Sequence, residues 1–255
     1  MNTERLSIRF THIRHATSLI DMDGTKFLID PMLSGKEKLP AVTLTRNRLK
    51  NPRIDLSFTA DSLLEETDYL MLTHLHFDHF DDEAARRIPK TLPVICSRND
   101  SKRLSKMGFT TLLPVSDSVV IKDVEIKRYP AVHGHGLLRF LTGEGSSFLI
   151  KYRGIKIFLT GDCVLTDSLK QILLETEPDV LIANGGAARF LFGKPITLSI
   201  KNIKELSSLL KDTKILVVHL NALNHCTETI DFCKEQIIGF SNIQIPSNGE
   251  TILLK

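Results

Sequence analysis

The chain has 255 residues, an apolar fraction of 42%, a charged fraction of 25% and a formal net charge of +3 at pH 7. These values are typical of a globular protein with a substantial core, and they exclude collagen-like, disordered and disulfide-scaffold classes. Lysines and arginines are scattered, so the sequence does not favour nucleic-acid binding, and the densest basic segment, 45–50, is expected to be a solvated loop.

Membrane and secretion signals are not apparent in the sequence. No apolar stretch reaches the roughly 18 to 20 residues that a spanning helix needs, and the first residues lack an apolar signal core. The four cysteines form neither a CxxC motif nor a paired spacing, which is typical of free thiols in a reducing compartment. We therefore expect a cytoplasmic protein without a membrane span. A homo-oligomer is compatible with the sequence, although no motif specifies one.

The first half of the chain alternates short apolar segments with turns. Asp23-Gly24 separates two such segments and predicts a β-hairpin. Residues 31–68 contain three prolines and many polar residues, so we expect a long irregular connection that forms a lid or a pocket wall. The other expected elements are strands at 6–12, 16–22, 26–30, 69–73, 93–96, 119–121 and 124–129, and helices from 81 onward and at 101–107.

The second half repeats this alternation of strands and helices. Arg153-Gly154 predicts a second hairpin turn. The expected strands are 146–152, 155–160, 179–183, 214–219 and 251–254, and the expected helices are 168–175, 200–210 and 227–238. Strands dominate both halves and helices follow in each. This order predicts two packed sheets with helices outside, a four-layer α/β/β/α sandwich, formed as one domain over residues 1–255.

A cluster of ligand-type side chains follows the apolar segment 69–73. His74, His76, Asp78 and His79 lie within six residues, in the pattern HxHxDH. Imidazoles and carboxylates bind zinc, manganese and iron at such spacings. Alternation after a strand places His74 and His76 on one side, where both can bind one metal ion. Asp78 and His79 can then bind a second ion.

The segment Ala131-Val-His-Gly-His-Gly136 carries two further histidines after a strand. One of them can supply the third imidazole of the first metal site, and the adjacent glycines allow close backbone approach. His133 lies nearer the strand and is our preferred ligand. His135 remains the alternative, and the other histidine is expected to line the pocket or to be exposed.

Asp162 and His219 each follow an apolar strand. Asp162 can bridge two metal ions, and the alternative is a structural aspartate in a turn or at a helix N-terminus. His219 is the preferred final ligand of the second ion over His225. His225 is then a candidate general acid or oxyanion stabiliser, or a structural histidine that caps the following helix.

With HxHxDH, a later histidine, Gly161-Asp162 and a strand-end histidine in this order, the chain resembles the metallo-β-lactamase superfamily. His15-Ala-Thr-Ser18 and Phe27-Leu-Ile-Asp-Pro31 resemble the opening hairpin of one branch of it. That branch contains L-ascorbate-6-phosphate lactonase and the N-acylphosphatidylethanolamine-hydrolysing phospholipase D. The resemblance implies one metal ion on His74, His76 and His133. It implies a second ion on Asp78, His79 and His219, with Asp162 as the bridge.

The resemblance implies a hydrolase with two divalent metal ions, with zinc as the first expectation and manganese or iron as alternatives. A bridging hydroxide would attack an ester, lactone or phosphodiester bond of a small molecule, with an anionic one as a candidate. Asp78 would orient this nucleophile, and His225 or a metal-bound water would protonate the leaving group. The loops at 184–188 and 194–197 are expected to line the pocket.

Two other classes of function compete with the hydrolase. An iron-dependent oxidoreductase of this fold would need an electron partner, and no flavin module is recognisable. Flavodiiron relatives typically carry glutamate where this chain has His76. A non-catalytic metal-binding scaffold would have lost ligands, yet every expected ligand is present. The segment that characterises the nuclease branch is also not recognisable, so the sequence favours hydrolysis of a small molecule.

Overall fold

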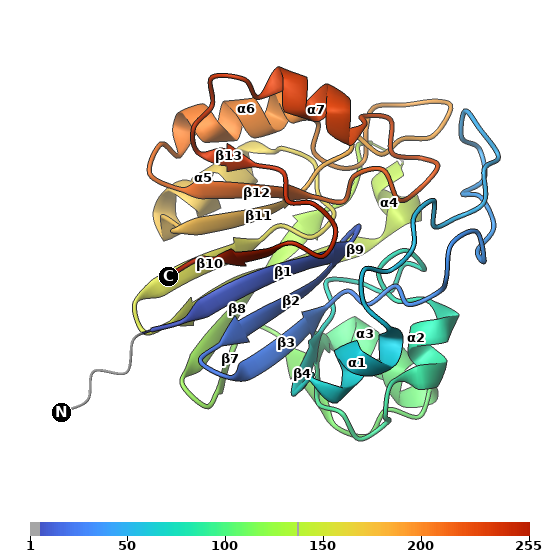
Figure 1. The fold of residues 1–255 in the computed structure, drawn as a ribbon, viewed down its shortest axis with the longest axis vertical. Coiled ribbons are helices and arrows are strands. Elements are labelled where there is room, and N and C mark those ends of the chain that lie inside the picture. Colours follow the sequence, from blue (N-terminus) through green and yellow to red (C-terminus); the bar gives the residue numbers. More distant parts are fainter. Residues whose placement is uncertain (1–5, 137) are drawn as a thin grey trace.

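The computed structural model describes residues 6–136 and 138–255. Two sheets pack face to face, and helices cover their outer faces (Figure 1). The first sheet contains β1 (Ile8–Arg14), β2 (Thr17–Met22), β3 (Thr25–Ile29), β4 (Tyr69–Met71), β5 (Val94–Ser97), β6 (Leu112–Val115) and β14 (Thr251–Leu253). The second contains β7 (Ser118–Ile121), β8 (Val124–Val132), β9 (Glu144–Tyr152), β10 (Ile155–Leu159), β11 (Val180–Asn184), β12 (Lys214–Val218) and β13 (Ile243–Gln244).

The sheet orders are β14-β1-β2-β3-β4-β5-β6 and β13-β12-β11-β10-β9-β8-β7. Strands β3 to β6 are parallel to one another, as are β10 to β13, while the remaining pairs are antiparallel. Apolar side chains of both sheets fill the space between them, with Phe10, Phe27 and Phe148 completely buried. Complete burial of such a side chain stabilises the fold by roughly 1.5–3 kcal/mol.

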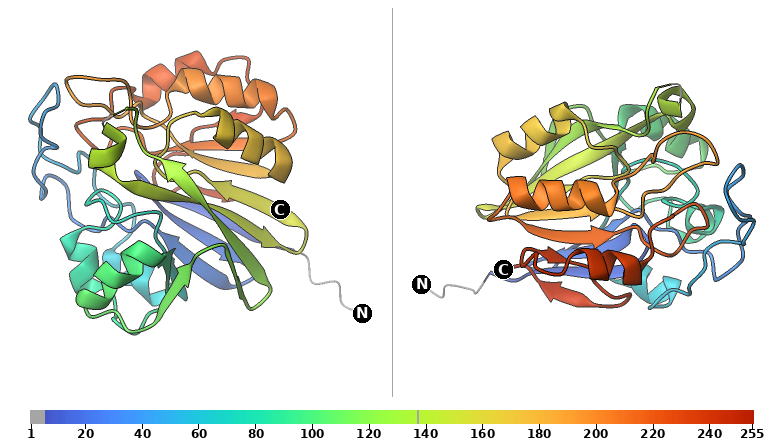
Figure 2. Two further views of the ribbon diagram at one scale, coloured as in Figure 1. Left: turned by 180° about the vertical axis from the view of Figure 1, so that it is seen from behind. Right: turned by 90° about the horizontal axis from the view of Figure 1, so that it is seen from above.

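Helices on the two outer faces complete the four layers (Figure 2). Helices α1 (Ala60–Glu65), α2 (Asp82–Arg87) and α3 (Arg98–Lys106) pack Leu63, Ala84 and Leu104 against the first sheet. Helices α5 (Asp167–Thr176), α6 (Ile200–Leu209) and α7 (Ile230–Gln236) pack Leu173, Leu206 and Cys233 against the second. The predicted α/β/β/α sandwich is confirmed. Among the described residues, no helix is both long and apolar enough to cross a membrane.

Several predicted element boundaries differ from the structure. The stretch 31–68 is not irregular throughout, because α1 forms within it, with the Thr59 side chain accepting a hydrogen bond from the Ser62 amide. Helix α7 begins at Ile230 rather than at 227, because Thr229 caps it and the amide of Thr227 donates to the Gly186 carbonyl instead. Strands β6 and β13 and the short helix α4 (Leu138–Thr142) were not predicted, since each is too short for a clear periodicity.

The loops that follow several strands meet at one end of the two sheets. They leave β4, β8, β10 and β12, and the β1–β2 turn joins them. The long segment 31–58 lies at the same end of the molecule, where the backbone amide of Leu191 donates a hydrogen bond to the Leu44 carbonyl (Figures 1 and 2). The fold thereby gathers side chains from distant parts of the sequence into one site.

Candidate metal centre

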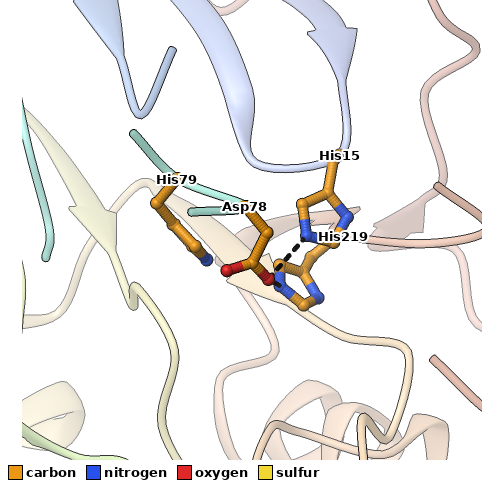
Figure 3. A group of neighbouring side chains, drawn as sticks. All are labelled: His15, Asp78, His79 and His219. Carbon is orange, nitrogen blue, oxygen red and sulfur yellow. Dashed lines mark hydrogen bonds and ion pairs between the residues drawn. The ribbon is translucent and has the colours of Figure 1, made fainter. Parts of the chain in front are cut away.

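The predicted ligands converge at this end of the sheets in three overlapping groups. Within each group, the ligand atoms all lie within 4.8 Å of one another. The groups are His74, His76 and His133; His74, His79 and Asp162; and His15, Asp78, His79 and His219. Figure 3 shows the last group, in which side chains from three loops point toward one another. The strand-end positions therefore place all seven predicted ligands at one location.

The first imidazole group forms around His74. Its Nε2 atom lies 2.9 Å from Nδ1 of His76. His133 joins them from the end of β8, and its Nε2 lies 3.7 Å from Oδ2 of Asp162. His135, the alternative ligand, is exposed and belongs to none of the three groups. The geometry thus favours His133.

Asp162 lies between the two sides of the cluster. Its Oδ1 atom is 3.3 Å from Nε2 of His79 and 3.3 Å from Nε2 of His219, while its Oδ2 atom faces His133. The Asn184 side chain donates a hydrogen bond of 2.9 Å to Oδ1 and fixes the carboxylate. Asp162 caps no helix, because Thr166 is the N-cap of α5. A carboxylate in this position can contact ions on both sides.

The donor atoms fit divalent metal ions. The Nε2 atoms of His79 and His219 are completely buried, and neither makes a hydrogen bond of regular geometry to a described residue, although Oδ1 of Asp162 lies 3.3 Å from each. Such unpaired buried polar atoms are costly, and a cation would satisfy them. Neutral imidazoles with carboxylates are the donors that zinc, manganese and iron accept.

Several imidazoles are oriented by contacts at the nitrogen that faces away from the cluster. Nδ1 of His79 lies 2.8 Å from Asp30, and Nδ1 of His133 lies 3.0 Å from the Ile196 carbonyl oxygen. Nδ1 of His74 lies 3.1 Å from the Thr73 hydroxyl. Contacts of this kind fix the ring orientation and tautomer of metal-binding histidines.

Burial and neighbouring charge act in opposite directions on these side chains. Burial alone would lower the pKa of His79, but the Asp162 and Asp30 carboxylates raise it to about 10. Burial would likewise raise the pKa of Asp78, but its hydrogen bond with His15 and the nearby imidazoles hold that pKa well below its usual value. Burial lowers the pKa of His225 to about 4. The ionised carboxylates therefore draw positive charge into the cluster.

His15 is a member of the cluster that was not predicted as a site residue. Its Nε2 atom lies 3.4 Å from Oδ2 of Asp78, and its ring lies 3.7 Å from the ring of His219 (Figure 3). The sequence offered a signal, since His15 opens the segment that resembles the superfamily hairpin. Asp30, which contacts His79, lies in the second such segment. Neither lies in a dense histidine motif.

His225 lines the cavity beside the cluster. Its Nε2 atom lies 3.8 Å from Oδ2 of Asp78. It does not cap the following helix, since Thr229 is the N-cap of α7. The structure therefore places this imidazole where it can reach a molecule held over the cluster.

A cavity of about 360 Å³ opens over the cluster. The predicted pocket wall in the segment 31–68 is confirmed by Val42 and Leu44, and Ile196 comes from the predicted loop 194–197. The prediction for the loop 184–188 is wrong, because no residue of it lines this cavity. The apolar lining residues are Val42, Leu44, Phe77, Leu138, Phe190, Phe192 and Ile196. Within the described part of the chain, neither lysine nor arginine lines the cavity, so the lining does not support an anionic substrate.

Several known proteins are similar to this chain in sequence and in fold. The UPF0173 protein YddR of Bacillus subtilis is 31% identical over 253 residues, which cover 96% of this chain and 99% of YddR. A possible metal-dependent hydrolase of Veillonella parvula superposes with a TM-score of 0.92 and 29% identity, covering 96% of this chain and 98% of that chain. An isothiocyanate hydrolase from Delia radicum gut bacteria superposes with a TM-score of 0.91 and 27% identity, also covering 96% of this chain and 98% of that chain.

Two further similarities concern the phospholipase D branch and the β-lactamase superfamily as a whole. An N-acyl-phosphatidylethanolamine-hydrolyzing phospholipase D of Caenorhabditis elegans is 31% identical over 85 residues, which cover 33% of this chain and 22% of the phospholipase. The family described as Beta-lactamase superfamily domain matches residues 9–219, which include every predicted metal ligand. The fold, the arrangement of the ligands and this match agree. The chain therefore belongs to the β-lactamase superfamily domain family.

Proposed function

We propose that this metal-dependent hydrolase holds two divalent metal ions and uses them to add water to an electrophilic centre of a small molecule. The observation that carries the proposal is the position of Asp162, whose two carboxylate oxygens face imidazoles on opposite sides of the cluster. Zinc is our first candidate, with manganese or iron as alternatives. We also propose that residues 1–255 act as one domain, in the cytoplasm.

Each ion would have its own set of side chains. His74, His76 and His133 would hold the first ion. Asp78, His79 and His219 would hold the second, and Asp162 would bridge the two. Bound ions of this kind lower the pKa of a water between them toward about 7 and polarise the bond under attack.

The side chains of the chain would position the reactants. Asp78 lies within 3.8 Å of both His219 and His225, so its carboxylate would be placed to orient the attacking water by accepting a hydrogen bond from it. His225 is not among the proposed ligands, and it lines the cavity. Because burial lowers its pKa to about 4, this imidazole is neutral at pH 7, and its N–H group can donate a hydrogen bond to the leaving group. These roles place the nucleophile on the cluster side and the leaving group on the cavity side.

Esters and lactones remain candidate substrates, and the Delia radicum gut-bacteria relative adds isothiocyanates. In all three, water adds to an electrophilic carbon. A phosphodiester has less support, because no lysine or arginine of the described chain lines the cavity to hold its remaining negative charge.

A hydrolysis assay with matched histidine variants tests the proposal. Protein reconstituted with zinc, manganese or iron is assayed on an ester, a lactone and an isothiocyanate. We expect turnover that is lost on chelation. His225→Gln should retain its metal and lose at least about tenfold in kcat, whereas the exposed His135→Gln should behave as the native chain. Full turnover by His225→Gln would refute its role, and native turnover without metal would refute the proposal.

A further inference from the structure

We infer that the site selects substrates whose substituent, remote from the reacting bond, is uncharged and apolar. This inference rests on the proposed function only in taking the metal cluster as the place where the reacting bond lies. The cluster forms one end of the cavity, so the remaining lining must contact the rest of the substrate. The chemistry of that lining therefore determines which substituents bind.

The cavity wall away from the cluster is almost entirely apolar. Phe77, Phe190 and Phe192 contribute aromatic side chains from two loops, and Leu44 contributes from a third. The charged groups of the lining are confined to the cluster, where Asp78 and Asp162 lie. Arg189 is close in sequence but donates a hydrogen bond to the Gly193 carbonyl and does not line the cavity. A remote carboxylate or phosphate would thus lose hydration without gaining a partner.

Large apolar side chains are also exposed at the mouth of the cavity. Leu44 and Phe192 have exposed fractions of 70% and 82%. Apolar side chains grouped at a concave site, rather than scattered singly, are typical of ligand-binding grooves. A volume of about 360 Å³ fits a small molecule such as a substituted aromatic ring.

Hydrogen bonds fix one wall to the floor of the cavity. The Asn224 side chain is buried, and its Oδ1 accepts hydrogen bonds from the Val42 amide and from Asn51, each of 2.9 Å. Its Nδ2 donates a hydrogen bond of 2.7 Å to the Thr45 hydroxyl. Asn224 directly precedes His225, so these hydrogen bonds join the loop that bears Val42 and Leu44 to the loop that bears His225. The apolar wall therefore exists before substrate arrives, which reduces the entropy lost on binding.

Paired metal-binding ligands test this selectivity without relying on turnover. Benzohydroxamic acid and 4-carboxybenzohydroxamic acid share a metal-binding head and differ by one remote charge. Both are titrated calorimetrically into protein whose metal content has first been measured. We expect the uncharged ligand to bind more tightly by about tenfold or more. Equal affinities, or tighter binding of the carboxylate, would overturn the inference.

Variants at two equally exposed phenylalanines localise the effect. Phe192 and Phe140 are both 82% exposed, but only Phe192 lines the cavity over the cluster. Phe192→Ala should reduce the difference in affinity between the two hydroxamates. Phe192→Lys should make the carboxylated ligand bind more tightly, because the lysine provides a cationic partner. Phe140→Ala should leave this difference in affinity unchanged. An identical response to Phe140→Ala and Phe192→Ala would contradict the assignment of this wall.

The ligand experiment and the hydrolysis assay fail separately. If metal-loaded protein hydrolyses none of the substrates but discriminates between the two hydroxamates, the proposed reaction is wrong and the selectivity stands. If it hydrolyses a substrate but binds both hydroxamates equally, the selectivity is wrong and the reaction stands.

Discussion

Nδ1 of His79 lies 2.8 Å from Oδ2 of Asp30, although 49 residues separate the two in sequence. Both side chains are buried, and Asp30 also accepts hydrogen bonds from the amide and the hydroxyl of Thr73. The carboxylate at the end of β3 thereby orients the imidazole so that its Nε2 faces Asp162. We infer that the Asp30–His79 pair holds the His79 imidazole in the orientation that the proposed metal centre requires.

Neutralising this support should weaken metal binding. Asp30→Asn preserves the shape of the side chain but removes the charge that holds the His79 ring and raises its pKa. We expect metal affinity to fall about 10- to 100-fold, as is typical when such a partner is changed. Competition with a chromophoric chelator measures the affinity.

The exposed Asp68 provides the matched control for this substitution. Its carboxylate accepts a hydrogen bond from the Lys26 amide, away from the cluster. Asp68→Asn should bind metal as the native chain does. Unchanged affinity in Asp30→Asn, with the fold intact, would mean that the pair does not support the site.

Gly161 holds Asp162 in place through a conformation that few residues adopt. Its φ is +57°, and a Cβ atom there would lie 2.5 Å from the Ser146 carbonyl oxygen and 3.1 Å from Thr73 Cβ. Gly161→Ala should therefore lower the free energy of unfolding by more than about 2 kcal/mol and displace the adjacent carboxylate. Urea unfolding and metal content measure the two effects.

Gly154 provides a control that distinguishes the effect of backbone strain from the effect of close contacts at Gly161. Its φ is +83°, but a Cβ atom there would meet nothing within 4 Å. Gly154→Ala should cost only about 1 kcal/mol and leave metal content unchanged. Equal losses of stability in the two variants would show that the close approach at Gly161 is unimportant.

Arg14 anchors the segment that forms the cavity wall. Its buried guanidinium donates hydrogen bonds to the carbonyl oxygens of Met32, Ser34 and Ile54. Two guanidinium nitrogens share these contacts, whereas Arg14→Lys would leave a single nitrogen that cannot occupy both positions, so we expect a loss of about 2–4 kcal/mol in the free energy of unfolding. Proteolysis within 32–54 should accelerate. The exposed Arg53→Lys serves as the control, and equal proteolysis of both variants would contradict this role.

Three cysteines should be protected from alkylation by their burial. Burial raises the pKa of Cys96, Cys163 and Cys233 to about 12, so almost none of these thiols is ionised at pH 8. Peptide mass spectrometry after iodoacetamide treatment should find the half-buried Cys226 modified first, and urea should expose all four. Modification of Cys163 as fast as Cys226 in the folded protein would contradict this.

The same pKa shifts predict the sign of a stability change in alkali. Unfolded thiols have a pKa near the ordinary value of 9.0, whereas burial raises the pKa of the folded thiols to about 12. Unfolding between these values releases protons, so this contribution is fully present below pH 9 and is lost as the pH rises toward 12. Urea titrations at pH 8 and 10 should show lower stability at pH 10, and a Cys163→Ala variant should show a smaller loss.

The sequence predicted the sandwich and the clustered ligands because both depend on local patterns. His74, Asp162 and His219 each follow an apolar strand, and ends of neighbouring strands meet in space. Asp30 and His15 escaped prediction as site residues, since their roles arise from contacts across the fold. The apolar lining of the cavity was not predicted from the sequence either. Phe190 and Phe192 lie in a loop without periodicity, and only the folded chain brings them beside Leu44.

The most direct test of the central claim is the metal content per chain of protein purified without a metal-affinity tag, for the native sequence and for Asp162→Ala. The account predicts about two equivalents of zinc, manganese or iron in the native chain, as a two-metal site requires. It predicts a sharp fall in the variant, with the far-ultraviolet circular dichroism of the fold retained. A native chain that binds no metal after incubation with each ion, or a variant that keeps both equivalents, would contradict it.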